Sequence, residues 1–261
     1  MSPSPVDLRI QIVNYRTKAF LLECLRSLFW SLTDADISYG VAILDNASGD
    51  DLSDLPTHFP DRPLELHHGR KNLGFGAGHN FLAARGDAGH LFFLNPDAQM
   101  LAPRTPEALL QRARATGAQV IGPRLVTEQG ATQKWDHGEL EGWIARLTLE
   151  SGNSYWRERT DATPAAWVSG AAFLIEKRWF DDVGGFDENF FLYKEEEELC
   201  WRLRALGGTI LYDPTLSVLH RGGVVATKSA HLRTSTDYFL HKHFRNRAGY
   251  PLFRLINRLL H

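Results

Sequence analysis

The feature that most constrains the fold is a repeated alternation between short apolar runs and segments with helical spacing. Apolar runs that end in polar residues occupy residues 8–15, 39–48, 64–69 and 90–98. Between the first two runs, residues 17–32 carry apolar side chains at the three- and four-residue spacing of a helix. Strands that alternate with helices predict an α/β fold with a mostly parallel central sheet.

The polar residues at the strand ends indicate where a ligand would bind. Asn14, Asp45 and the turn at residues 95–98 each follow an apolar run. In open α/β sheets, ligands bind beyond the carboxyl ends of the strands. We therefore expect these three segments to lie at one edge of the sheet and to face a common site.

The second half of the chain is less regular. Residues 127–164 are polar and rich in tryptophan, with weak periodicity, which predicts an excursion over the sheet that acts as a lid. An apolar strand at residues 171–176, a short helix, a glutamate-rich helix and a final strand follow. From Lys228 onward the tail holds seven Lys and Arg against the single acid Asp237, and residues 228–261 are predicted to form a basic helical extension.

Length and composition narrow the class of protein. The 261 residues suffice for one large α/β domain with a full core. Lys and Arg number 29 against 31 Asp and Glu, so no global basic field indicates a nucleic-acid partner. Cys24 and Cys200 lie in apolar helical patterns without CxxC spacing, which predicts buried thiols in a reducing compartment. No apolar signal region or membrane-spanning run occurs, so we expect a cytoplasmic protein.

Four consecutive glutamates, Glu195 to Glu198, stand out because adjacent like charges repel. At about 100° per residue, Glu196 lies on the arc of apolar side chains that should meet the core, namely Leu199, Cys200 and Leu203. A carboxylate on an apolar face costs free energy unless it has a use, and burial would raise its pKa and make it a better base. We expect Glu196 to be functional, Glu195 and Glu197 to be ordinary first-turn acids, and Glu198 to pair with Arg202.

Seven motifs follow one another along the chain. They read "VNYRTKAFLLECLRSL", "ILDNASGD", "NLGFGAGHN", "FFLNPDA", "VSGAAFLI", "GGFDENFFLYKEEEELCWRLR" and "DPTLSVLHRGG". In this order they resemble the inverting glycosyltransferases of family 2, and within them the rhamnosyltransferase-like branch. The resemblance implies a single domain with the GT-A (Rossmann-like) fold over residues 1–227. Residues 1–100 would be its nucleotide-sugar donor half and residues 101–227 its acceptor half, with the tail outside it.

The resemblance implies a donor site for a nucleoside-diphosphate sugar, with dTDP or UDP as the nucleotide. Asn14, Tyr15 and Asp45 match the segments that hold the nucleoside in this family. Asn72 and Gly74 match the loop that lies against the nucleoside and the sugar. From the residues alone, an Asx turn at Asp45 and a glycine-rich helix start at Gly74 remain alternatives.

The resemblance also implies a divalent metal that grips the diphosphate. The acidic D-x-D motif of the family reads Asn95, Pro96, Asp97 here, so its first carboxylate is an amide. Asp97 is the implied metal ligand, Asn95 supports it in the donor site, and His220 matches a second metal ligand. Mg²⁺ or Mn²⁺ suits oxygen ligands together with a diphosphate. A purely structural role for His220 remains the alternative.

The family's pair of adjacent acids places the catalytic base second. This carries over to Glu196, which stands where relatives have Asp, and it agrees with the helix-face argument. Trp167, Gly170 and Glu195 correspond to the acceptor side. Trp167 would either stack on a sugar ring or pack in the core, and the sequence favours neither.

These assignments imply transfer of a sugar, with L-rhamnose from dTDP-rhamnose as the first choice, to a hydroxyl of a saccharide or lipid-linked saccharide in cell-surface polysaccharide synthesis. A UDP-sugar transferase of the same family and an inactive nucleotide- or carbohydrate-binding protein remain alternatives. A nucleotidyltransferase is disfavoured, because no glycine-rich basic loop follows the first strand. The tail mixes cations with aromatic and aliphatic residues, which suits peripheral contact with the cytoplasmic face of a membrane. Helices packed over the sheet are the alternative, and they are favoured before Gly249.

Overall fold

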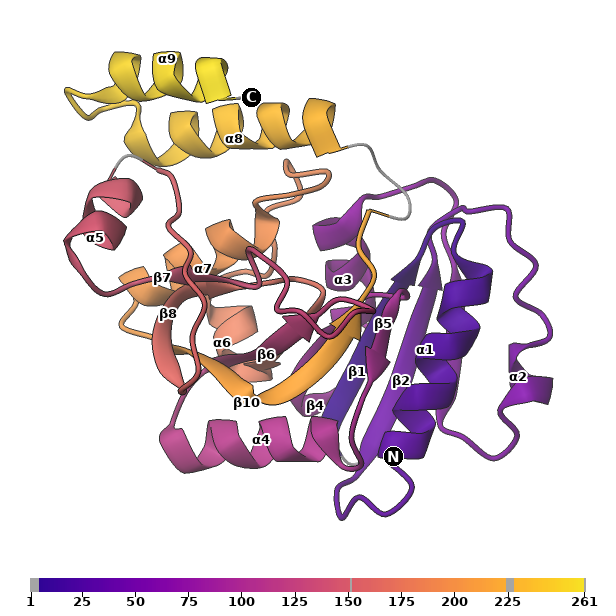
Figure 1. Ribbon diagram of the computed structural model, residues 1–261. Helices are drawn as coiled ribbons and strands as arrows, with labels where there is room; N and C mark the ends of the chain where they lie inside the picture. Colours follow the sequence, from indigo (N-terminus) through magenta and orange to yellow (C-terminus); the bar gives the residue numbers. More distant parts are fainter. Residues whose placement is uncertain (1–4, 151, 224–227, 261) are drawn as a thin grey trace.

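The computed structural model describes residues 5–150, 152–223 and 228–260, whose strands form one central sheet (Figure 1). The strands are β1 (Val6–Asn14), β2 (Tyr39–Asp45), β3 (Leu64–His68), β4 (Ala88–Leu94), β5 (Ala98–Met100), β6 (Val120–Val126), β7 (His137–Glu139), β8 (Thr163–Val168), β9 (Ala172–Glu176) and β10 (Ile210–His220). The helices are α1 (Lys18–Ser31), α2 (Leu55–His58), α3 (Phe75–Ala83), α4 (Thr105–Thr116), α5 (Trp143–Glu150), α6 (Lys177–Asp182), α7 (Glu195–Ala205), α8 (Lys228–Phe244) and α9 (Tyr250–Leu260).

The first half of the sheet is parallel, as the alternation of strands and helices predicts. β3, β2, β1 and β4 lie side by side in that order and run in the same direction. A helix lies in each of the connections between consecutive strands, which supplies the crossover that parallel neighbours need. The register pairs Asn14 at the end of β1 with Asp45 at the end of β2, so the carboxyl ends of these strands meet at one edge.

The prediction of a mostly parallel sheet holds for this first half only. Beyond β4 the order continues β9, β6, β10, β8 and β7, and β9 is antiparallel to both of its neighbours. β10 is parallel to β6 but antiparallel to β8 and β5. The regular alternation of strand and helix ends after β6, because residues 127–164 contribute β7, α5 and irregular backbone instead of a crossover helix on the sheet.

Helices cover both faces of the sheet, and each face has its own apolar core. α1 and α4 pack on the face that carries Phe92, whereas α6 and α7 pack on the face that carries Phe93. Successive side chains of a strand point to opposite faces, so the continuous apolar run in β4 is what a strand buried on both sides requires. Cys24 lies in the first core and Cys200 in the second, which confirms the prediction of buried thiols.

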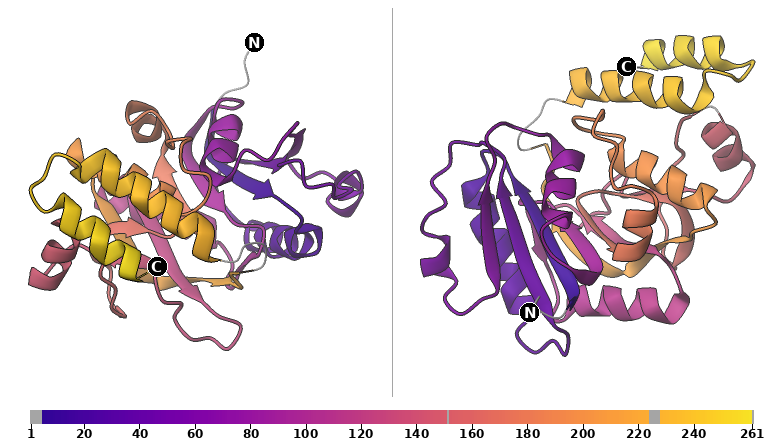
Figure 2. Two further views of the ribbon diagram at one scale, coloured as in Figure 1. Left: turned by 90° about the horizontal axis from the view of Figure 1, so that it is seen from above. Right: turned by 180° about the vertical axis from the view of Figure 1, so that it is seen from behind.

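The C-terminal helices α8 and α9 lie across one end of the domain, over α7 and next to α5 (Figure 1, Figure 2). A buried cluster joins α8 to the segment before α7 and consists of Phe190, Phe239, Leu240 and Phe244. α8 is therefore packed on the domain, which is the alternative favoured before Gly249. None of the helices in the described ranges has the length and apolar content that a membrane span requires.

Candidate active site

The predicted donor residues gather where the parallel strands end. Asn14 and Asp45 are the last residues of β1 and β2, and Asn95 directly follows β4. β1 lies between β2 and β4, so the three positions share one edge of the sheet. Their common location is confirmed, and donor binding at this edge stays a prediction.

The Asn14 side chain is buried and joins neighbouring loops. Its Oδ1 accepts a hydrogen bond from Thr17 Oγ1 (2.7 Å), and its Nδ2 donates to Asp50 Oδ2 (3.0 Å). Asp50 Oδ2 also accepts the backbone N–H of Thr17 (3.0 Å). The Asn14 amide thus shapes the start of α1. The half-buried Tyr15 follows it, with the Arg16 guanidinium 5.1 Å from its ring centroid.

Asp45 forms the turn that the sequence offered as the alternative to nucleoside binding, and its contact with the nucleoside stays a prediction. Its Oδ1 accepts hydrogen bonds from the backbone N–H and the hydroxyl of Ser48, three residues on, at 3.2 Å and 2.5 Å, so the side chain closes the turn as an Asx motif. Its Oδ2 lies 3.6 Å from Nδ1 of the exposed His68. One oxygen therefore fixes the turn, and the other faces an exposed side chain at the edge of the sheet.

Asn72 and Gly74 lie in a loop held by Asn46, a buried residue that the sequence analysis missed. Asn46 Nδ2 donates to Asn72 Oδ1 (2.9 Å) and to the Gly74 carbonyl (3.1 Å), and its Oδ1 accepts the Leu73 N–H (2.8 Å). Gly74 has a φ of +85°, and a Cβ there would collide with the carbonyl oxygen of Phe191. The position of Asn46 directly after Asp45 was the only signal in the sequence.

Asn95, Asp97 and His220, the residues assigned to the metal and diphosphate, come together in space. β10 pairs with β5 and thereby brings its last residue, His220, beside the turn before β5. His220 Nε2 lies 3.4 Å from Asp97 Oδ1 and 3.2 Å from Asn95 Nδ2. The second ring nitrogen, Nδ1, lies 2.7 Å from Oε1 of Gln133. Gln133 belongs to the weakly periodic segment, where no sequence signal marked it.

This donor set fits a divalent cation. When His220 Nδ1 carries the proton and donates to Gln133, Nε2 presents a lone pair toward Asp97, so two acceptors face each other across 3.4 Å. A cation between them would remove the repulsion. In the described ranges no three side chains of the types His, Cys, Asp and Glu converge. The third ligand would therefore be a bound diphosphate, or the Asn95 amide oxygen after the amide turns, because its Nδ2 faces His220 in this structure.

Glu196 lies in the first turn of α7, against the turn that joins β8 to β9. A Cβ at Gly170 would lie 3.8 Å from the carboxyl carbon of Glu196, and the nearby backbone N–H of Gly170 lowers the pKa of this carboxyl. The carbonyl of the next residue, Ala171, accepts the Asn95 N–H at 2.8 Å. Two adjacent residues of one turn thus hold the predicted base close to the predicted metal-binding turn.

The protonation of Glu196 suits a base. Burial, and after it the charge of Glu197, raises the pKa of Glu196 to about 7. Its Oε2 is buried and has no hydrogen-bond partner among the described residues. A carboxylate with a pKa near neutrality and an unoccupied oxygen can accept a proton from a bound hydroxyl. The catalytic role itself stays a prediction.

The expectation that Glu195 is an ordinary first-turn acid is wrong. Glu195 is only 3% exposed, and burial, followed by the charge of Glu196, raises its pKa well above the usual range. The helical wheel missed this because it considers α7 alone. α3 packs over the first turn, where a Cβ at Gly76 would lie 3.6 Å from Glu195 Cβ. Contact of Glu195 with an acceptor stays a prediction.

Glu198 pairs with Arg202 as predicted, and also with two residues of α8. Its carboxylate lies 2.7 Å from Arg202 Nη2, 2.6 Å from Lys242 Nζ and 3.2 Å from His243 Nε2. Burial alone would raise the pKa of Glu198, but hydrogen bonds from His243, Arg202 and Lys242 outweigh it and hold the pKa at about 2. Glu198 thereby ties the basic tail to the domain.

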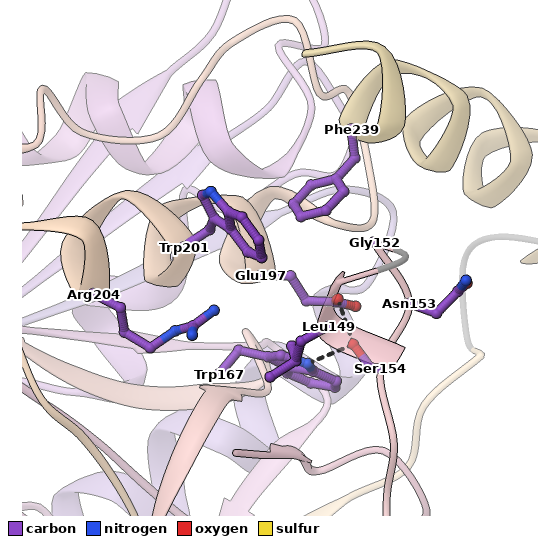
Figure 3. Close-up of a pocket in the computed structure, with 9 residues that line it drawn as sticks. All are labelled: Leu149, Gly152, Asn153, Ser154, Trp167, Glu197, Trp201, Arg204 and Phe239. Carbon is purple, nitrogen blue, oxygen red and sulfur yellow. Dashed lines mark hydrogen bonds between the residues drawn. The ribbon is translucent and has the colours of Figure 1, made fainter. Parts of the chain in front are cut away.

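Trp167 is buried in the core and hydrogen-bonded. It is 5% exposed, and its Nε1 donates to Ser154 Oγ at 2.9 Å. It also lines a small pocket of about 10 Å³, which is at the lower limit for a single water molecule (Figure 3). Core packing of Trp167 is observed, and stacking on a sugar stays a prediction.

Comparison with known proteins identifies the family. The family model described as "Glycosyl transferase family 2" matches residues 10–184, well over half of the chain. The chain belongs to glycosyl transferase family 2. Solved structures similar to this family 2 member include S. aureus TarS, with a TM-score of 0.65 at 11% identity over 90% of this chain and 39% of that chain. A mannosyltransferase from Pyrobaculum calidifontis, in complex with GDP-Man and Mn²⁺, has a TM-score of 0.64 at 12% identity. The match covers 98% of this chain and 70% of the mannosyltransferase chain. The GT-A fold is confirmed.

Curated relatives of this family 2 member include a rhamnosyltransferase, as the motifs implied. The N-acetylglucosaminyl-diphospho-decaprenol L-rhamnosyltransferase of Mycobacterium tuberculosis is 30% identical over 172 residues, 57% of this chain and 56% of its own. A low-salt glycan biosynthesis hexosyltransferase of Haloferax volcanii is 26% identical over 254 residues, 92% of this chain and 74% of its own. The O-antigen biosynthesis protein RfbC of Myxococcus xanthus is 23% identical over 92% of this chain and 20% of its own. The match thus spans little more than half of the mycobacterial relative.

Proposed function

We propose that this family 2 member is an inverting glycosyltransferase that moves a sugar from a nucleoside-diphosphate donor to a hydroxyl of an acceptor. The observation that supports this best is the turn at Gly170 and Ala171, which contacts Glu196 through one residue and Asn95 through the next. Direct displacement at an anomeric carbon needs a base and a diphosphate-binding group held close together. This turn supplies that proximity.

In the proposed reaction, Glu196 takes the proton of the acceptor hydroxyl as its oxygen attacks the anomeric carbon. The new C–O bond forms on the face opposite the C–O bond to the diphosphate. That bond breaks and leaves its electron pair on the nucleoside diphosphate, so the configuration inverts. Asp97, His220 and Asn95 would hold Mg²⁺ or Mn²⁺, which supplies positive charge to the departing diphosphate when bound. The Gly170 N–H keeps the Glu196 carboxylate aimed at the acceptor.

For the substrates we propose L-rhamnose from dTDP-rhamnose, transferred to a saccharide or lipid-linked saccharide in cell-surface polysaccharide synthesis. The motif resemblance and the relatives in mycobacteria and Myxococcus support this choice. The nucleoside would lie against Asn14, Tyr15, Asp45, Asn72 and Gly74. The acceptor would lie against Trp167, Gly170 and Glu195. A UDP-sugar donor is the second candidate, supported by a structural neighbour, S. aureus TarS 1-349, solved in complex with UDP.

Nucleotide and metal together should raise the melting temperature. We expect Mn²⁺ with dTDP or UDP, but not with GDP or CMP, to stabilise the protein, because the nucleoside would add contacts at Asp45 and the metal-bound diphosphate would add contacts at Asp97. At 100 times the dissociation constant the gain is about 2.7 kcal/mol, or roughly 5–10 °C for a chain of this size. Asp97→Asn should abolish the part of the shift that depends on Mn²⁺, whereas Asp182→Asn, at an exposed carboxylate on α6, should keep it. A folded protein that none of the nucleotides stabilises would contradict the donor site.

We further propose that α9 contacts an anionic membrane, which would bring a lipid-linked acceptor to the site. Leu252 and Leu255 lie three residues apart and are 57% and 56% exposed, while Phe253 packs toward Phe244 of α8. Arg254 lies on the same helix. A helix with an exposed apolar stripe and basic flanks lies in the interface of a bilayer.

Paired substitution of these leucines should release the protein from membranes. Leu252→Asp with Leu255→Asp removes apolar contact worth roughly 3 kcal/mol, so co-sedimentation with phosphatidylglycerol vesicles should weaken ~100-fold. Leu206→Asp, at a similarly exposed leucine after α7, is the matched control and should sediment as the wild type does. Equal sedimentation of the paired variant, or none by the wild type, would refute the contact.

A further inference from the structure

Lys194 directly precedes α7, and three of its local features cost free energy. Its φ is +70°, and Tyr193 before it has a φ of +71°, a region that residues with side chains rarely adopt. Lys194 is the N-cap of the helix, where Ser, Thr, Asp or Asn would accept a hydrogen bond, and it makes no such bond. It also carries a cation at the positive end of the helix dipole. Such local costs persist only where the surrounding structure compensates for them.

The compensating contact is made through the lysine side chain. Lys194 Nζ lies 2.9 Å from Glu197 Oε2, and the two side chains are only 10% and 15% exposed. The same Glu197 oxygen accepts Ser154 Oγ at 2.8 Å, and Ser154 Oγ in turn accepts Trp167 Nε1 at 2.9 Å. Figure 3 shows Glu197, Ser154 and Trp167 converging at one wall of the small pocket. A chain of hydrogen bonds therefore runs from β8, through Ser154, to the start of α7.

The other end of the turn before α7 is fixed as well. The Phe191 carbonyl accepts the Phe75 N–H at 3.0 Å and lies directly against Gly74. Only three residues separate Phe191 from Glu195, the first residue of α7. The backbone turns into the helix within them because Tyr193 and Lys194 are both left-handed. If the Lys194 ammonium were released, the turn could relax toward ordinary dihedral angles. The first turn of α7 would then move relative to the β8–β9 connection.

We propose that Lys194 is a positioning residue, which holds the left-handed turn through Glu197 and Ser154 and thereby sets the Glu196 carboxylate against the Gly170 amide. The proposal rests on the role of Glu196 as the base. It differs from an ordinary buried ion pair in a measurable way. An ordinary pair would affect stability alone, whereas a positioning residue affects the contact between Glu196 and Gly170.

The test uses variants of the whole 261-residue chain, and its two main measurements need no substrate. Lys194→Met removes the ammonium and keeps the aliphatic stem, Lys194→Arg keeps the cation, and Ser154→Ala loosens the far anchor without changing any charge. Two NMR signals are followed: hydrogen exchange of the Gly170 amide, and titration of the Glu196 carboxyl carbon, assigned with Glu196→Gln.

The titration readout depends on the groups that act on the Glu196 carboxylate. These are the charges of Glu197, Glu195 and Lys194, the Gly170 N–H, and the neighbouring phenol of Tyr193. Movement of the Glu196 carboxylate away from the Gly170 N–H should raise the midpoint of Glu196, because that N–H favours the ionised form. Ser154→Ala therefore separates repositioning from the mere loss of the lysine charge.

We expect Gly170 exchange to become about 10-fold faster in Lys194→Met and in Ser154→Ala, and the Glu196 midpoint to rise in both. Lys194→Arg should restore both signals. Arg204→Met, whose cation lines the same pocket against Trp201, is the matched control and should change neither. Donor turnover, measured with dTDP-rhamnose, should fall ~10- to 100-fold in Lys194→Met at unchanged donor KM.

Different results would overturn the positioning role of Lys194 and the base role of Glu196. Unchanged Gly170 exchange and an unchanged Glu196 midpoint in Ser154→Ala would overturn the positioning role, even if Glu196→Gln is inactive. Full activity of Glu196→Gln would instead overturn the base assignment, while a shifted midpoint would still show that Lys194 acts on Glu196.

Discussion

Replacement of Glu196 by glutamine should lower sugar transfer by ~10²- to 10⁴-fold and leave nucleotide binding intact. Glutamine has nearly the same size and can still accept the Gly170 N–H through its amide oxygen, but it cannot take up a proton. Oε2 of Glu196 has no partner among the described residues, so the substitution leaves no cation unpaired at that oxygen. The measurement is the initial rate of nucleotide release with an acceptor present, beside the melting shift that dTDP or UDP causes.

The wild-type pH profile gives a second readout of the same prediction. Burial raises the pKa of Glu196 to about 7, so the carboxyl is protonated below that pH and ionised above it. Only the ionised form accepts a proton, and kcat/KM should therefore rise with pH around a midpoint of about 7 and level off roughly one pH unit above it. Glu188→Gln, at an exposed glutamate before α7, should leave the rate and the profile unchanged. Turnover of Glu196→Gln near the wild-type rate would exclude Glu196 as the base.

The place of the site could be predicted because it follows from strand direction and from motif order. Asn14, Asp45 and Asn95 meet at one edge because β1, β2 and β4 are parallel and end there. Asp97 and His220 lie more than 100 residues apart in the sequence, and only the family resemblance brought them together. The structure agrees, because β10 pairs with β5 and brings its last residue next to that turn.

The burial of individual side chains, and their contacts with other helices and strands, could not be predicted from the sequence. A helical wheel contains no neighbours, so it predicts Glu195 to be an ordinary first-turn acid, whereas α3 covers this residue in the fold. Glu197 was misjudged for the same reason, since Lys194 and Ser154 enclose it. The parallel sheet was extended too far because residues 127–164 have no periodicity that reveals how the chain returns.

Replacement of the buried Glu198 by glutamine should cause a large loss in the free energy of unfolding. Glu198→Gln removes the negative charge that faces the cations of Arg202 and Lys242 and the imidazole of His243. Breaking a buried pair on one side costs about 3–5 kcal/mol. We expect about 3 kcal/mol here, because Lys242 keeps Asp187 at 2.6 Å and Arg202 keeps two backbone carbonyls. The melting temperature should fall by roughly 6–12 °C.

The stability difference between wild type and Glu198→Gln should depend on pH, because the pKa of Glu198 is lowered in the folded protein. Burial would raise the pKa of Glu198, but hydrogen bonds from His243 and Arg202 hold it at about 2, against about 4.3 in an unfolded chain. The wild-type advantage is therefore complete above about pH 5 and is lost as the pH falls toward 2, so the gap in melting temperature should narrow between about pH 5 and 3. Glu107→Gln is the control: this carboxylate is also buried but has one cationic partner, the half-exposed Arg104, and its loss should cost about 1 kcal/mol. A gap that stays constant down to pH 3, or equal losses in both variants, would mean that the charge of Glu198 does not contribute the expected stability to the contact between α7 and α8.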